Sequence, residues 1–365
     1  MRIDHIEPVV VKVNSRGDWV FVQIHTDEGL IGLGEASQTF NDALVVKKLA
    51  QMSQFLKGRD PGQINAIFQD VNQPHLGKTE QTAIGAVEQA LWDLKGQRLG
   101  VPIHELLGGA LRDRLILYAN INRHVDDRSP AGFARAACQA VEDGYKSIKM
   151  APFDELNAWD RPMTGCNALW RKGVARVRAV REAIGPGIEL AVDCHNRLEP
   201  SEAILVADAL AELDLFWFEE PVSERYAEEL AQVSHRVSMP TASGENIFGV
   251  EGYRQLILTR AVDVIMPDVK HVGGIAALCQ VAAAARINQI LVSPHSPSGP
   301  VSTAAGAQAA ATLDNFYRLE YAWGEVDWRA ELLDPPETIE DGHLILPRGP
   351  GLGHRLNQAV VSQHI

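Results

Sequence analysis

The sequence predicts an α/β protein in which a closed β/α barrel follows a smaller α+β unit. Two patterns support this fold class. Up to about residue 112, alternation of apolar and polar residues gives way to helical periodicity. Beyond it, short apolar runs alternate with amphipathic helical segments in six or more units, which is typical of a parallel sheet buried on both faces. So many units favour a barrel over an open sheet.

The first unit is expected to span residues 1–112. Alternating apolar and polar residues, with tight turns between them, predict three antiparallel strands over residues 3–13, 19–25 and 30–35. Apolar residues at three- and four-residue steps predict helices over residues 42–56 and 82–99.

The second unit is expected to span residues 113–328. Its strands are predicted at apolar runs over residues 147–150, 188–193, 215–219, 241–245, 262–268 and 289–295. The remaining segment, 329–365, carries a Pro-Pro pair and a strand-like stretch, and we expect it to return to the first unit.

Charge and composition narrow the class of protein. The 365 residues include 34 Lys and Arg against 47 Asp and Glu, so the formal net charge is −13. Because phosphate binding needs a basic surface, nucleic acid is not an expected partner. Hydrophobic residues make up 46% and charged residues 22% of the chain, which indicates a folded globular protein.

No segment predicts a membrane anchor or a disulfide framework. The N-terminal sequence lacks an apolar signal core, and no run approaches the roughly 18 apolar residues of a membrane span. The four cysteines lie far apart without CxxC spacing, so neither structural zinc nor disulfides are indicated. We expect a cytoplasmic homo-oligomer with no membrane partner.

Three carboxylates follow consecutive predicted barrel strands. Asp193, Glu219 and Glu245 are separated by 26 and again by 26 residues, which is one strand-helix unit each. Any one of them alone could be a helix N-cap or a loop residue. Together they predict a site for a hard divalent cation, because converging carboxylates otherwise repel each other. Mg²⁺ is the first candidate, Mn²⁺ is an alternative, and the absence of Cys and His from this set disfavours zinc.

Four further polar residues occupy strand ends, where barrel enzymes place their active sites: Lys149, Asp268, His295 and Glu320. Lys270 and His271 lie beyond their strand, and we interpret them as loop residues.

Several segments together resemble the enolase superfamily, in its mandelate racemase branch. The resemblance covers nearly the whole chain. The segments that carry it are AIGAVEQALWDLKGQRLGVPIHELLGG from residue 83, DCHNR from 193, FEEP from 218, ASGEN from 242, MPDVKHVGG from 266 and the Pro-His pair at 294–295. The resemblance implies an α+β capping domain over a modified (β/α)₇β barrel. It also implies one essential Mg²⁺ that stabilises an enediolate.

The resemblance assigns roles by position. It implies that the metal ligands are Asp193, Glu219 and Glu245. Asp268 stands where this branch has the aspartate that orients a histidine, and His295 stands where it has that histidine. Glu320 resembles the acidic residue that hydrogen-bonds the substrate carboxylate. Sister branches place a lysine at the position of Asp268, so this pair separates the chain from muconate-cycloisomerase-like and dipeptide-epimerase-like proteins.

One position departs from the racemase pattern. The racemase has two lysines separated by one residue, and here the sequence is Lys149-Met-Ala151, so one of the two bases is absent. His195, two residues after Asp193, is a candidate replacement, because it resembles the histidine of galactonate-dehydratase-like and mannonate-dehydratase-like members. Alternatively, His195 structures the loop together with Arg197.

The substrate contacts are less specified. Candidates are Asn120, Asn122, Arg197 and Trp323. The 14–18 loop is short for a lid, so residues 38–42, residues 75–78 or a neighbouring subunit would enclose the site.

These features favour a magnesium-dependent dehydratase that acts on a small sugar acid. Lys149 and Glu320 would join the metal in stabilising the deprotonated acid, while His195 and His295 would exchange protons and Asp268 would orient His295. The expected product is a 2-keto-3-deoxy acid. The alternatives are a racemase, epimerase or cycloisomerase of a hydroxy acid on the same scaffold, and a metal-binding scaffold without catalysis.

Overall fold

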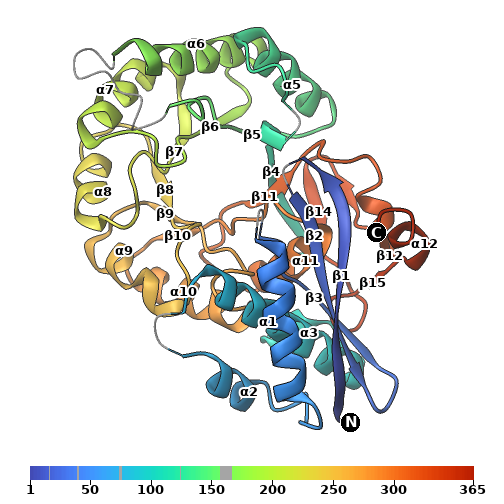
Figure 1. Ribbon diagram of the computed structural model, residues 1–365. Helices are drawn as coiled ribbons and strands as arrows, with labels where there is room; N and C mark the ends of the chain where they lie inside the picture. The colour runs from blue at the N-terminus through green and yellow to red at the C-terminus, as the bar shows by residue number, and fades with distance from the viewer. Residues whose placement is uncertain (16, 39–40, 74–75, 124, 157–166) are drawn as a thin grey trace.

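The structure of the protein is a computed structural model that describes residues 1–15, 17–38, 41–73, 76–123, 125–156 and 167–365. An N-terminal α+β domain lies beside a ring of strands and helices, and the C-terminal segment lies against the N-terminal sheet (Figure 1). None of the described helices is both long and apolar enough to cross a bilayer.

The N-terminal domain is a three-stranded antiparallel sheet covered by helices. Its strands pair in the order β1 (Ile3–Asn14), β2 (Gly17–Thr26) and β3 (Ile31–Glu35), as the alternation predicts. The helices are α1 (Asp42–Leu56), α2 (Ile64–Val71) and α3 (Lys78–Leu99). Helix α1 and most of α3 coincide with helices predicted from the sequence, whereas the eight-residue α2 is not predicted. Gly32 and Gly34 let β3 approach α3, since a Cβ at Gly32 would lie 2.2 Å from the Ala90 carbonyl oxygen.

The second domain is the predicted (β/α)₇β barrel. Its parallel strands are β4 (Arg114–Asn120), β5 (Ser147–Met150), β6 (Glu189–Asp193), β7 (Leu215–Glu219), β8 (Thr241–Ser243), β9 (Val264–Ile265), β10 (Leu291–Val292) and β11 (Leu319–Ala322). The helices between them are α5 (Pro130–Glu142), α6 (Asn167–Ile184), α7 (Pro200–Leu210), α8 (Ala227–Ser234), α9 (Arg254–Thr259), α10 (Ile275–Ile287) and α11 (Pro300–Ala310). Pairing of β11 with β4 and a bridge between Val292 and Phe316 close the ring.

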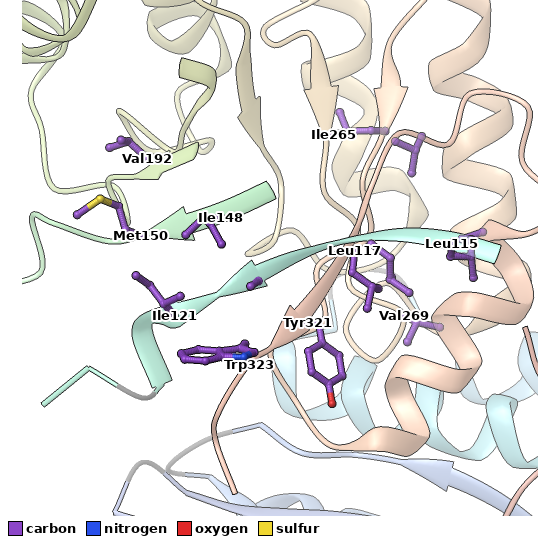
Figure 2. Packing of buried hydrophobic residues seen from close by; sticks show 14 of the residues in the cluster. Leu115, Leu117, Ile121, Ile148, Met150, Val192, Ile265, Val269, Tyr321 and Trp323 are labelled. Atoms are coloured by element: carbon purple, nitrogen blue, oxygen red, sulfur yellow. The ribbon is translucent and has the colours of Figure 1, made fainter. Parts of the chain in front are cut away.

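Strand alternation sorts the side chains between two cores. Residues such as Leu117, Ile148 and Val192 point outward into the large hydrophobic core between strands and helices (Figure 2). Their neighbours point inward and form a small apolar plug made of Tyr118, Ala191, Trp217, Ala242, Val264 and Met266. Because side chains alternate along a strand, the residues two positions after Tyr118, Ala191, Trp217 and Met266 face the interior at the carboxyl end of the barrel, and these are Asn120, Asp193, Glu219 and Asp268.

Two buried carboxylates of the N-terminal domain bind the amino ends of barrel helices. Glu35 accepts hydrogen bonds from the backbone N–H groups of Gly299 and Ser302 at the start of α11, both at 2.8 Å. Glu88 on α3 accepts from the backbone N–H groups of Ile275 and Ala276 at the start of α10, at 2.7 and 2.9 Å. The positive ends of the two helices therefore hold the N-terminal domain over the barrel mouth.

The C-terminal segment contacts both domains. It contains β12 (Leu333–Asp334), β13 (Ile339–Glu340), β14 (His343–Ile345), β15 (Arg355–Leu356) and α12 (Gln358–Val361). Strand β14 pairs with β4 of the barrel, while the Lys12 N–H of β1 donates to the carbonyl of His364 at 2.6 Å. The C-terminal segment thus contacts β1 of the N-terminal domain and pairs with β4 of the barrel.

Candidate active site

The carboxyl end of the barrel and the N-terminal domain enclose a cavity of about 400 Å³. Among the described residues, the following predicted site residues line it: Asn120, Asn122, Lys149, Asp193, His195, Glu245 and His295. Glu219, Asp268 and Glu320 are fully buried and contact lining residues. The side chains at the carboxyl ends of the barrel strands therefore lie together around one cavity.

Asp193, Glu219 and Glu245 each offer an oxygen within 4.8 Å of the others. Asp193 Oδ2 and Glu245 Oε2 are buried and accept no hydrogen bond. His195 Nε2 lies 3.0 Å from the first oxygen and His295 Nε2 lies 3.1 Å from the second, but outside hydrogen-bond geometry. Burial and the neighbouring carboxylate of Asp193 raise the pKa of Glu219 to about 8. An all-oxygen set with unsatisfied anionic atoms fits a hard divalent cation.

Lys149 lies between the carboxylates. Its Nζ is 2.7 Å from Glu219 Oε1, 2.8 Å from Glu320 Oε1 and 3.5 Å from Asp193 Oδ2. Burial would lower the pKa of Lys149, but Glu219 and Glu320 outweigh it and raise that pKa well above its usual value. Lys149 is therefore a fixed cation beside the three oxygen donors.

His295 and Asp268 form a hydrogen-bonded pair. The His295 Nδ1 lies 2.8 Å from Asp268 Oδ2, which leaves Nε2 on the side of Glu245. Burial would lower the pKa of His295, but Glu245 and Glu320 raise it to about 9. The pair has the geometry expected for an aspartate that orients a histidine.

Lys270 and His271 lie in the turn after β9, as loop residues do, but both side chains are buried. Lys270 is 1% exposed and its Nζ donates to Asp268 Oδ2 at 2.7 Å. His271 is 3% exposed and lines the cavity, and its Nδ1 lies 2.9 Å from Thr82 Oγ1. A turn that folds back under the cavity buries both side chains.

His195 has a carboxylate partner that sequence reasoning missed. Its Nδ1 lies 2.5 Å from Asp154 Oδ1, and Asp154 Oδ2 accepts from Arg128 at 3.1 Å. Asp193 Oδ1 accepts the backbone N–H of His195 at 2.9 Å, in a turn where His195 and Asn196 have φ of 45° and 59°. This left-handed backbone is uncommon for residues other than glycine and aims the ring into the cavity.

Two asparagines connect the first strand to this group. Asn120 donates to Glu320 Oε1 at 2.8 Å, and its own Oδ1 accepts the backbone N–H of Asn122 at 2.9 Å. Asn122 accepts the backbone N–H of Ala151, at the position where the racemase pattern has its second lysine. Glu320 also accepts the backbone N–H of Ser296 at 2.9 Å.

Two predicted substrate residues are not among those that line the cavity. Trp323 lies in the large hydrophobic core with Ile121 and Tyr321 (Figure 2), and its indole N–H donates to Asp143 at 2.8 Å. Strand alternation explains this placement, because Trp323 and Glu320 are an odd number of residues apart. Arg197 follows the turn that carries His195, and its backbone N–H donates to the Cys194 carbonyl at 2.9 Å.

The enclosing residues come from the N-terminal domain. Ser37, Gln38 and Lys78 line the cavity opposite the barrel. Gln38 and Lys78 belong to the two segments in which enclosure is expected from the sequence, whereas residues 39–40 and His75 lie outside the described residues.

Comparisons with known proteins agree over nearly the whole chain. Residues 132–360 match a family described as enolase C-terminal domain-like, and residues 3–108 match the mandelate racemase / muconate lactonizing enzyme N-terminal domain. D-xylonate dehydratase of Haloferax volcanii is 32% identical over 97% of this chain and 87% of its own length. D-gluconate dehydratase of Thermoproteus tenax is 31% identical over 99% and 74%.

A solved structure shows the same fold. A mandelate racemase/muconate lactonizing enzyme-like protein from Rubrobacter xylanophilus superimposes with a TM-score of 0.91 at 32% identity, over 100% of this chain and 97% of its own.

Proposed function

The chain belongs to the mandelate racemase/muconate lactonizing enzyme family of the enolase superfamily, and from this premise we propose that it is a magnesium-dependent dehydratase of a sugar acid. The observation that carries the proposal is one cavity where two histidine-carboxylate pairs face three clustered carboxylates, two of which have a buried oxygen without a hydrogen bond. The dehydratase names of the xylonate and gluconate relatives support the same reaction class.

The metal would be held by Asp193, Glu219 and Glu245. A divalent cation there would supply the Lewis acidity that lowers the free energy of the dianion left when the substrate carboxylate loses its α-proton. We propose Mg²⁺ as this ion, with Mn²⁺ as an alternative, because all three ligands are hard oxygen donors.

Lys149 and Glu320 would bind the substrate carboxylate. Lys149 places a buried positive charge beside the metal ligands, which favours the extra negative charge that develops when the α-proton leaves. Glu320, held by Asn120 and by Ser296, can share a proton with the second carboxylate oxygen.

His195 and His295 would exchange protons with the substrate. One of them takes the α-proton as a neutral base, and the other, as the imidazolium, protonates the departing β-hydroxyl. Asp154 and Asp268 each accept from the Nδ1 of one ring, so both rings keep Nε2 available for proton transfer. Loss of water gives an enol, which becomes a 2-keto-3-deoxy acid.

A screen of five- and six-carbon sugar acids with Mg²⁺ tests this function, with 2-keto-3-deoxy products detected by semicarbazide absorbance. The same reactions in D₂O report exchange of the α-proton. Exchange without loss of water would instead support a racemase or epimerase. If no acid gives either signal while the metal binds, the enzymatic proposal is wrong.

His295→Asn should reduce elimination by about 100-fold or more, since positioned acid-base groups contribute roughly that much. His235→Asn is the matched control, because His235 is an exposed residue that directly follows α8. Full turnover by His295→Asn would remove the assigned proton-transfer role.

A further inference from the structure

Two side chains of the N-terminal domain reach the cavity and have no role in the chemistry proposed above. Gln38 is 6% exposed, and its Nε2 donates to Thr79 Oγ1 at 3.1 Å while its Oε1 has no hydrogen-bond partner. Lys78, next to Thr79, is the first residue of α3. Both line the cavity. A buried amide with an unsatisfied atom indicates that a polar group of a ligand completes it.

Lys78 is a partly buried lysine without a close ion-pair partner. No carboxylate of the described part of the chain lies within ion-pair distance of its ammonium group, whereas the two fully buried lysines have such partners. Lys149, for example, has three carboxylates within 3.5 Å, and Lys270 has Asp268 at 2.7 Å. Burial lowers the pKa of Lys78, and the more distant Asp268 and Glu245 only partly oppose this. A partly buried ammonium group without a close partner is stabilised when an anion reaches it.

The local backbone adds to the positive potential. Lys78 begins a helix of 22 residues whose N-cap, Gly77, has no side-chain oxygen, and Glu80 is the one acidic residue of its first turn. The N-terminus of a long helix carries partial positive charge. The ammonium of Lys78 and the first turn of α3 are thus at the same edge of the cavity, across from the barrel carboxylates.

We propose that Lys78 and Gln38 form a subsite for a second carboxylate at the far end of the substrate, so that the preferred substrates are sugar diacids rather than monoacids. This inference rests on the proposed dehydratase function and narrows its substrate class. One carboxylate of the diacid lies against the metal ligands and Lys149, and the other lies against the N-terminal domain. A cavity of about 400 Å³ accommodates such a small, extended ligand.

The amide of Gln38 can serve this subsite in the orientation that presents its NH₂ group. Amide oxygen and nitrogen are interchangeable in shape, so Oε1 can accept from the Thr79 hydroxyl while Nε2 donates to the ligand. In the opposite orientation, Oε1 would accept from a terminal hydroxyl, as a monoacid would offer. The two substrate classes therefore make opposite demands on the same side chain.

Galactarate and galactonate are suitable probes, because they differ only in a carboxylate or a hydroxymethyl group at the end of the chain. Binding to the Mg²⁺-loaded His295→Asn variant is measured by titration calorimetry, so that turnover does not intervene. We expect galactarate to bind at least about 10-fold more tightly, and Lys78→Met to weaken galactarate about 10- to 100-fold while galactonate changes less than about 3-fold. Gln38→Leu should show the same selectivity with a smaller loss, and Lys78→Arg should restore most of the affinity for galactarate.

Lys47→Met is the matched control, because Lys47 is an exposed lysine on α1. Equal weakening of both acids by Lys78→Met would contradict the subsite, because Lys78 would then only balance the barrel carboxylates. If galactonate binds and galactarate does not, the diacid inference fails and the dehydratase proposal stands. If neither acid binds the metal-loaded protein, the diacid inference fails, and the screen of sugar acids decides the dehydratase proposal separately. Unchanged thermal unfolding of Lys78→Met confirms that the variant is folded.

Discussion

Asp154 is expected to position His195, and Asp154→Ala tests this. Asp154 has no other predicted part in the reaction, since it does not line the cavity, and its contact with the site is the 2.5 Å hydrogen bond to Nδ1 of His195. Burial would raise the pKa of Asp154, but the bond and charge of His195 and the charge of Arg128 outweigh it and lower that pKa. Asp154 is therefore a stable anion that holds the ring.

The magnitude follows from this bond. Hydrogen bonds to charged groups contribute about 1.5 to 3 kcal/mol. If all of this free energy holds the His195 ring in its reactive orientation, loss of the bond lowers the rate about 10- to 150-fold. The side chains of His195 and Asp154 keep 35% and 28% of their exposure, so solvent weakens the bond and we expect the lower part of this range. Asp154→Asn should lose less, because an amide oxygen can still accept from Nδ1.

The assay separates positioning from binding. Steady-state kinetics on the best acid of the screen should show a lower kcat with KM nearly unchanged, and α-proton exchange in D₂O identifies the impaired step. Glu155→Gln is the control, because Glu155 binds Arg176 and lies near Arg128 without touching His195. A kcat of Asp154→Ala within about 2-fold of wild type, or a rise in KM alone, would refute the positioning role.

Two further predictions concern the metal and a buried carboxylate. Removal of divalent cations with a chelator should abolish turnover, and Mg²⁺ should restore it. Mg²⁺ at 100 times its Kd should stabilise the folded protein by about 2.7 kcal/mol, and Glu219→Gln should lose this stabilisation. A wild-type unfolding temperature that does not change with Mg²⁺ would contradict the site. Burial raises the pKa of Glu88 to about 7 from an ordinary value of 4.5, so the folded state binds this proton more tightly than the unfolded state does. The wild-type protein should therefore lose stability relative to Glu88→Gln as the pH rises from about 4.5 to about 7. The loss should reach about 3 kcal/mol in urea unfolding, and parallel pH profiles of the two proteins would refute it.

The part of the site that follows strand periodicity could be predicted from sequence. The spacing of 26 residues between Asp193, Glu219 and Glu245 reports one barrel unit, and the register pairs Asp193 directly with Glu219. Lys149 and Glu320 follow by the same rule, since each lies at an inward position of a short strand. A repeated backbone geometry converts sequence position into spatial position, so these predictions depend little on loops, although Glu245 lies in the turn that directly follows β8.

The part that depends on loops could not be predicted in the same way. Asp154 lies five residues beyond Lys149 in a turn, and its contact with His195 spans 41 positions, so no periodicity links them. His271 shows the same limit, because the turn after β9 decides whether it faces solvent or the cavity. Trp323 is the opposite case, because strand alternation by itself already indicates that its side chain points outward from the barrel and away from the cavity.

Docking of the two domains and recognition of the substrate depend on the same segments. Gln38 follows Glu35 by three residues, and Glu35 is fixed by the amino end of α11. Lys78 begins the helix whose Glu88 is fixed by the amino end of α10. Each substrate-facing residue is thus a few residues or a few helical turns from a buried carboxylate bound to the barrel. Because a long helix moves as a rigid body, loosening the contacts of Glu88 should shift Lys78 relative to the metal ligands. Loosening the contacts of Glu35 should shift Gln38, which lies only three residues further along the chain. Substrate preference and domain docking should therefore change together.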